Sequence, residues 1–127
     1  CHCTICQEYN QAPYGDITIF RPKDVIMPNK DSVSYKSYQA PGLLQRGSCI
    51  NCGKPALEYI NVFSKPSLVI VPNKNIADKT IIPEASLHIF YHSRVADVSD
   101  DLPKYNGYLS SQIALGHKLM SAIIKKK

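Results

Sequence analysis

Most of this 127-residue chain lacks cysteine, and it also lacks the segments that mark membrane and secreted proteins. No apolar run approaches the roughly 20 residues that a membrane-spanning helix needs. No secretory or transit segment is visible. The sequence therefore predicts no membrane association, and a cytoplasmic location with reduced thiols is the default expectation. The chain starts without methionine, so we expect that a segment upstream is missing, processed or not included.

An arginine-rich stripe is lacking too. The formal net charge is +5, but three of the positive charges are the terminal residues 125–127. Basic and aromatic residues are not interleaved as they are in RNA-binding modules. We expect the basic tail to solvate a helix end and complement its dipole, and we do not expect nucleic acid as a partner.

The composition is that of a folded domain. Hydrophobic residues make up 44% of the chain and charged residues 20%, which are ordinary values for globular proteins. A chain of this length is expected to fold as one domain with a real hydrophobic core.

The five cysteines fall in two clusters. Cys1, Cys3 and Cys6 form a C-x-C-x-x-C run, and Cys49 and Cys52 form a C-x-x-C pair followed by glycine. Thiolates bind zinc at about 2.3 Å, and a two-residue gap lets one turn aim both sulfurs at one ion. The glycine suits such a turn because it adopts positive φ without a steric penalty. This pattern predicts zinc binding by all five cysteines.

Other roles for these cysteines fit less well. Disulfides need an even count and an oxidising compartment. A thioredoxin-like redox site would place its C-x-x-C at the start of a helix, whereas residues 53–55, Gly-Lys-Pro, break a helix at once. Buried structural cysteines would not explain the clustering. The 42 residues between Cys6 and Cys49 are too many for a simple zinc ribbon, so a sheet either unites the clusters or keeps them as two sites.

The hydrophobic pattern predicts short strands followed by one helix. Alternating, β-branched or short apolar segments predict strands at 16–20, 32–38, 56–63, 68–71 and 87–91, and residues 43–48 are expected to form a strand that delivers Cys49. Turns or loops are expected at 7–15, 41–42, 73–83 and 95–103. Apolar residues then recur at helical spacing from Leu109, and Ser110 or Ser111 could cap that helix. The fold class predicted is mainly β with a C-terminal α-helix.

Several separated stretches resemble, in the right order, one known family. They are residues 1–6, 13–15 and 46–53, then the closing stretches 83–91 and 100–105. Together they resemble the glutathione-dependent formaldehyde-activating enzyme family, also called the CENP-V/GFA domain. The resemblance implies a GFA/CENP-V-like zinc-binding β domain over residues 1–107, with a C-terminal helix and basic tail over residues 108–127.

The resemblance also implies an Mss4-like fold of stacked β-sheets that holds zinc at two sites. The catalytic zinc would be held by Cys1, Cys3 and Cys6. The structural zinc would be held by Cys49 and Cys52 with two further cysteines from an N-terminal Cys-x-Cys-Gly strand, which this sequence does not contain. The structural site is thus left with half of the family's ligands.

The activity implied by the resemblance is that of a carbon–sulfur lyase, which joins the sulfur of glutathione to formaldehyde and gives S-hydroxymethylglutathione. Three thiolates leave one position on zinc open, where a substrate thiol could lose its proton. Glutathione, a small thiol, is therefore the expected partner. The alternative is a non-catalytic, zinc-stapled β module that binds a protein partner.

Several polar residues have competing interpretations. His2 lies between two ligands, so its side chain is expected to point away from their ion. His88 fits a buried core histidine better than a functional one. His92 and Arg94 follow the last predicted strand and could hold an anionic peptide substrate. Asp100 and Asp101 are expected in a solvated turn before proline.

The remaining apolar candidates concern packing. Tyr9, Tyr14 and Tyr91 could line a pocket, although packing is the more common role of tyrosine. The apolar stripe of the C-terminal helix is expected either to pack on the sheet, which we favour, or to form a homodimer contact.

Overall fold

The computed structural model describes residues 1–38, 43–62 and 65–125, and the chain divides into two compact units. One unit is Asp16–Pro83. The other combines Cys1–Gly15 with Glu84–Lys127. The turn predicted at 41–42, the end of the strand predicted at 56–63 and the last two lysines lie outside the described residues.

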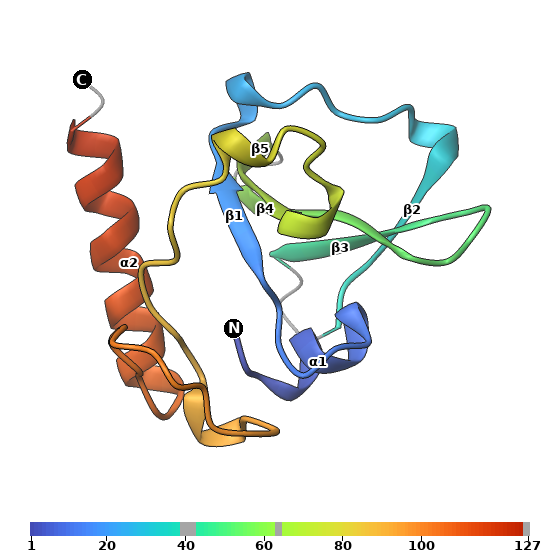
Figure 1. Ribbon diagram of the computed structural model, residues 1–127. Coiled ribbons are helices and arrows are strands. Elements are labelled where there is room, and N and C mark those ends of the chain that lie inside the picture. The colour runs from blue at the N-terminus through green and yellow to red at the C-terminus, as the bar shows by residue number, and fades with distance from the viewer. Residues whose placement is uncertain (39–42, 63–64, 126–127) are drawn as a thin grey trace. The chain divides into compact units, whose positions relative to one another are not determined.

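The first of these units is built on a five-stranded antiparallel sheet with the strand order β1-β5-β4-β3-β2 (Figure 1). Its strands are β1 (Ile17–Phe20), β2 (Val33–Lys36), β3 (Leu44–Cys49), β4 (Pro55–Val62) and β5 (Lys65–Pro72). Five of the six predicted strands are therefore confirmed. Strands β1, β2, β4 and β5 contain β-branched or aromatic residues, which fit a pleated surface, whereas β3 contains neither. A mainly β fold with a C-terminal helix is confirmed.

Both faces of this sheet bury side chains. Leu57 and Val33 are buried, and Gly47 lies between them in β3, paired with both neighbouring strands. The other face carries Arg46 and Glu58, which are partners across β3 and β4 and form a buried ion pair at 2.5 Å. Buried charges in proteins are normally paired in this way, because an unpaired charge loses its hydration without compensation.

The second unit begins with a helix that the sequence analysis missed. Residues 7–15 were predicted to be a turn region, but helix α1 spans Thr4–Asn10. The sulfur of Cys3 caps this helix by accepting a hydrogen bond from the backbone N–H of Cys6. Three residues of the helix, Cys6, Tyr9 and Asn10, are buried. Tertiary burial and a cysteine cap therefore stabilise a helix too short to be stable alone.

The strand predicted at residues 87–91 is wrong. Only His88 forms a bridge, parallel to Lys104, with His88 N donating to Pro103 O and Tyr105 N donating to His88 O, both at 2.9 Å. Phe90 adopts a left-handed conformation with φ of 54°, which ends the extended segment and starts a 3-10 helix at Tyr91–Ser93. The apolar pattern of this segment reflects burial of Ile89 and Tyr91 rather than a full strand.

The predicted C-terminal helix is present as α2, which spans Tyr108–Lys125 (Figure 1). It starts after Gly107, at φ of 88°, so the expected cap at Ser110 or Ser111 is wrong. Ser111 is instead fully buried and accepts a hydrogen bond from the backbone N–H of Phe90. Within α2, Leu109, Ile113 and Met120 are exposed. No helix among the described residues has the length and apolar character that crossing a bilayer requires.

Candidate metal centre

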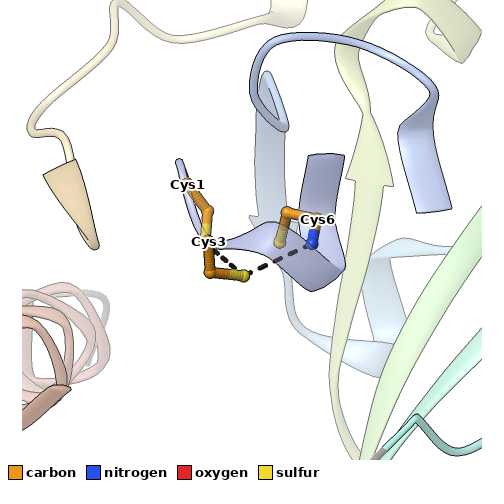
Figure 2. Close-up of side chains that lie close together, drawn as sticks. All are labelled: Cys1, Cys3 and Cys6. Carbon is orange, nitrogen blue, oxygen red and sulfur yellow. Dashed lines mark hydrogen bonds between the residues drawn. The ribbon is translucent and has the colours of Figure 1, made fainter. Parts of the chain in front are cut away.

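Three thiols converge at the N-terminal end of α1. The sulfur atoms of Cys1, Cys3 and Cys6 all lie within 4.8 Å of one another, and those of Cys1 and Cys3 are 3.4 Å apart. Figure 2 shows the three side chains gathered around the sulfur of Cys3. Cys6 is buried, and the other two are half-buried. This group could hold a metal ion.

The local sequence explains the convergence. Cys3 is the cap of α1, and Cys6 lies in the first turn of that helix, so the x-x spacing brings both sulfurs to the same helix end. Cys1 is held by a pair of backbone bonds to Gly15, with its nitrogen donating to Gly15 O at 2.9 Å and its carbonyl accepting from Gly15 N at 2.8 Å. A Cβ at Gly15 would lie 3.1 Å from the side chain of Asn10 and 3.6 Å from that of Cys6, so this close approach suits glycine.

The second cysteine pair lies in the sheet unit. Cys49 ends β3, and Cys52 follows in a tight turn in which Gly53 N donates to Cys49 O at 2.8 Å. Gly53 has a φ of 74°, which agrees with the positive φ expected for the glycine after the C-x-x-C pair. The backbone N–H groups of Cys52 and Asn51, and then the Cys52 thiol, donate toward the Cys49 sulfur and lower the pKa of its thiol. Both cysteines are free, Cys49 half-buried and Cys52 exposed.

His2 contributes a buried polar contact next to the three thiols. Its side chain is only 1% exposed, and its Nε2 lies 2.9 Å from Nδ1 of His88. Burial is the largest cause that lowers the pKa of His2, to about 4, so the ring is neutral near pH 7. The rings of Tyr14 and Tyr91 flank it, with centroids at 4.9 and 5.0 Å.

The second ring nitrogen of His88, Nε2, contacts a carboxylate. His88 Nε2 lies 2.8 Å from Oδ2 of Asp100, and the ammonium of Lys104 donates to Oδ1 of the same carboxylate at 2.8 Å. The bonds from Lys104 and His88 hold the pKa of Asp100 well below its usual range. Asp100 is thus not a simple solvated turn residue, although it does accept a turn bond from the backbone N–H of Leu102.

His88 is buried, as predicted, but sequence reasoning missed its link to Asp100 and Lys104. Eighty-six positions separate His2 from His88, so no local pattern could bring them together. The available signal was indirect, since residues 83–91 and 100–105 carry part of the family resemblance.

The two candidates for binding an anionic substrate are exposed. His92 accepts a hydrogen bond on Nδ1 from the backbone N–H of Gly107 at 2.7 Å. Arg94 pairs with Asp97 at 2.5 Å, donates to the carbonyl of Tyr91 at 3.1 Å and stacks over the Tyr91 ring, 4.4 Å from its centroid. The side chain of Asp97 is 84% exposed, so this ion pair faces water and can rearrange.

A family model described as glutathione-dependent formaldehyde-activating enzyme matches residues 1–93 of the chain. The match covers most of the 127 residues, including both cysteine clusters and the segment through His92. The chain belongs to this family. Searches among curated proteins and among solved structures found no match. The resemblance drawn from the sequence is therefore confirmed. In this member of the family, Cys1, Cys3 and Cys6 form a cluster that could hold a metal ion.

Proposed function

We propose that this GFA-family chain is a zinc-dependent carbon–sulfur lyase that acts on the adduct of glutathione, or a similar small thiol, with formaldehyde. The observation that carries the proposal is the convergence of Cys1, Cys3 and Cys6 in a chain matched by the family model. In this reaction the thiol sulfur adds to the carbonyl carbon, a C–S bond forms and the thiol proton ends on the carbonyl oxygen. No oxidant or reductant is needed.

The three thiols suit zinc in type and spacing. Zinc–sulfur bonds of about 2.3 Å in a tetrahedral site put the sulfurs about 3.8 Å apart. The observed 3.4 Å between Cys1 and Cys3, and the 4.8 Å limit for the whole group, are close to that value. Three cysteines leave the fourth position for a small ligand, as in catalytic rather than structural sites. When bound there, zinc would supply a substrate thiolate at neutral pH and polarise the aldehyde oxygen.

Under this proposal the cysteines divide by role. Cys1, Cys3 and Cys6 are the ligands of the catalytic zinc. Cys49 and Cys52 supply two thiolates to a second, structural zinc, and the lowered pKa of the Cys49 thiol supports that role. A thiol-dependent reaction also favours a reducing compartment, which supports a cytoplasmic location.

Arg94 and His92 are proposed to bind the carboxylates of the thiol substrate. Gln7 on α1 donates from its side-chain nitrogen to both His2 O at 2.7 Å and Ser93 O at 2.8 Å. This double contact ties the residue before Arg94 to the backbone between Cys1 and Cys3. An arginine has five N–H donors, of which the bonds to Asp97 and Tyr91 use two, so Arg94 retains donors for a carboxylate.

The test combines metal analysis with direct observation of the reaction. The purified chain should contain zinc, and exchange NMR with ¹³C-formaldehyde and glutathione should show faster adduct exchange than the uncatalysed mixture. Cys3→Ser should abolish the acceleration. Arg94→Gln should raise KM for glutathione with little change in kcat, whereas the matched control Arg21→Gln, whose arginine also pairs with an aspartate three residues on, should change neither. Bound zinc with no acceleration would instead support the non-catalytic binding module.

A further inference from the structure

A line of polar side chains connects the backbone between Cys1 and Cys3 to residues 88–104. The ammonium of Lys104 donates to Asp100, His88 Nε2 lies 2.8 Å from the same carboxylate, and His88 Nδ1 lies 2.9 Å from His2 Nε2. Both rings are buried, His2 at 1% and His88 at 9% exposure. The proposed addition of a thiol to formaldehyde uses none of these side chains.

The donors and acceptors in this line of side chains fix the orientation of the His2 and His88 rings. A carboxylate can only accept, so His88 Nε2 carries the proton of its bond to Asp100. The bond between His88 Nδ1 and His2 Nε2 then holds one proton, whichever nitrogen carries it. A flip of either ring would put a C–H group against a buried nitrogen or a carboxylate and leave that group without its hydrogen bond, which is unfavourable for a buried polar atom. His2 Nδ1 is buried and has no hydrogen-bond partner among the described residues, so the contact with His88 orients the ring.

Hydrogen bonds also hold the main chain of His2. Its N–H donates to the carbonyl of Ile89 at 3.0 Å, and its carbonyl accepts from the side chain of Gln7 at 2.7 Å. The residues on either side of it are Cys1 and Cys3. Holding the ring and both peptide groups of His2 therefore restricts the backbone from which two of the three sulfurs project.

We propose that Asp100 and His88 are positioning residues for the cysteine cluster: acting through His2, they hold the sulfurs of Cys1 and Cys3 in the arrangement that binds the metal ion. This inference rests on the proposed zinc site. In known metal sites, partners that orient the ligands change metal affinity about 10–100-fold when they are mutated. Here the oriented group is the peptide segment that carries the ligands.

The test is zinc affinity, measured by competition with a chromophoric chelator, together with the thiolate-to-metal absorption of the cobalt(II)-loaded chain. Asp100→Asn keeps the size of the side chain but cannot accept from both His88 and Lys104 as the carboxylate does. We expect it to weaken zinc binding by about 10-fold and to alter the cobalt spectrum. Asp101→Asn makes the same charge change at an exposed neighbour and should do neither. His88→Phe should match Asp100→Asn, with His117→Phe on the exposed side of α2 as its control.

A second readout does not need metal. In the metal-free chain, alkylation of Cys1 and Cys3 can be followed by mass spectrometry, with Cys49 and Cys52 of the other unit as the internal reference. Asp100→Asn should raise the alkylation rate of Cys1 and Cys3 relative to that reference, because the backbone between them is released.

The outcomes separate the two proposals. Wild-type chain that binds no zinc would overturn the proposed function, while the alkylation ratio would still decide the positioning role. Zinc affinity and alkylation in Asp100→Asn equal to those in Asp101→Asn would overturn the positioning role. A lower melting temperature in Asp100→Asn with unchanged zinc affinity and alkylation would also overturn it, since this is what a purely structural role predicts.

Discussion

The packing on one face of the sheet depends on the absence of a side chain at Gly47. A Cβ built at this position would lie 2.6 Å from Val33 Cγ1, 2.7 Å from the Tyr35 ring and 2.9 Å from Leu57 O. The ring of Tyr35 occupies that space and contacts Tyr59 edge-on at 5.0 Å. The absence of a side chain in the middle of β3 therefore allows the two tyrosines to meet.

Gly47→Ala should therefore destabilise the chain. Backbone on one side and packed side chains on the other leave no room for the added methyl, and such overpacking costs about 1–3 kcal/mol. The measurement is the denaturant midpoint. Gly116→Ala is the matched control, because open space surrounds Gly116 in α2, and alanine there should be neutral or stabilise by up to about 1 kcal/mol. Equal effects at the two positions would contradict the packing argument.

Asp100 provides a prediction about pH. Lys104 and His88 lower its pKa in the folded chain, so its carboxylate stabilises the fold above the unfolded pKa of about 3.9, and this contribution is lost as pH falls toward the folded value. Wild type should melt higher than Asp100→Asn at pH 6–7, and the gap should narrow below about pH 4. A gap that stays constant from pH 7 to 3 would show that the charge of Asp100 does not stabilise the fold.

At the scale of elements, the sheet was predictable and the cysteine unit was not. Strands β1, β2, β4 and β5 follow from alternation, β-branched residues or a short apolar run, which indicate burial on a pleated surface whatever the partner strand is. Strand β3 has no β-branched residue and was expected because it leads from a turn to Cys49. Helix α1 has a sulfur cap at Cys3 in place of the usual oxygen, so the sequence offered no familiar start signal. The segment at 87–91 has the apolar content of a strand, but the left-handed Phe90 ends it, and nothing local predicts positive φ at phenylalanine.

The candidate site also has a part that the sequence predicts and a part that it does not. The spacing of Cys1, Cys3 and Cys6 predicted a shared ion, because ligand spacing is local chemistry, and the structure brings the three sulfurs together. The bond between His2 and His88 depends on how residues 1–3 lie beside Ile89, which only the tertiary fold determines.

The two cysteine elements should respond differently to substitution. Cys3→Ser alters the cap of α1 and removes a proposed catalytic ligand, so it should abolish the acceleration of adduct exchange over the uncatalysed mixture. Cys49→Ser alters the turn after β3 and should mainly lower the melting temperature. The checks are exchange NMR for activity and thermal melting for stability. Equal effects of both substitutions on activity and stability would contradict the division of the cysteines into a catalytic and a structural site, and would favour a single shared site.

At the scale of the whole molecule, each compact unit carries its own group of thiols. Cys1, Cys3 and Cys6 lie in the unit that contains both α-helices, and Cys49 and Cys52 lie in the sheet unit. Metal bound only by the folded chain stabilises it in proportion to the logarithm of free metal over Kd. Stability should therefore depend on zinc as well as on the sheet core.

Chelation should lower the melting temperature reversibly. Free zinc at 100 times its Kd adds about 2.7 kcal/mol to the free energy of unfolding, and thiolate–zinc sites in small domains reach roughly 10 kcal/mol or more of binding energy. For a domain of this size, a few kcal/mol corresponds to a shift of about 10 °C. The measurement is calorimetry before chelation, after chelation with metal confirmed absent, and after zinc is restored. Cys3→Ser should show a smaller shift than wild type, because one proposed ligand is already gone, and an unchanged wild-type melt in strong chelator would contradict the role of zinc in stability.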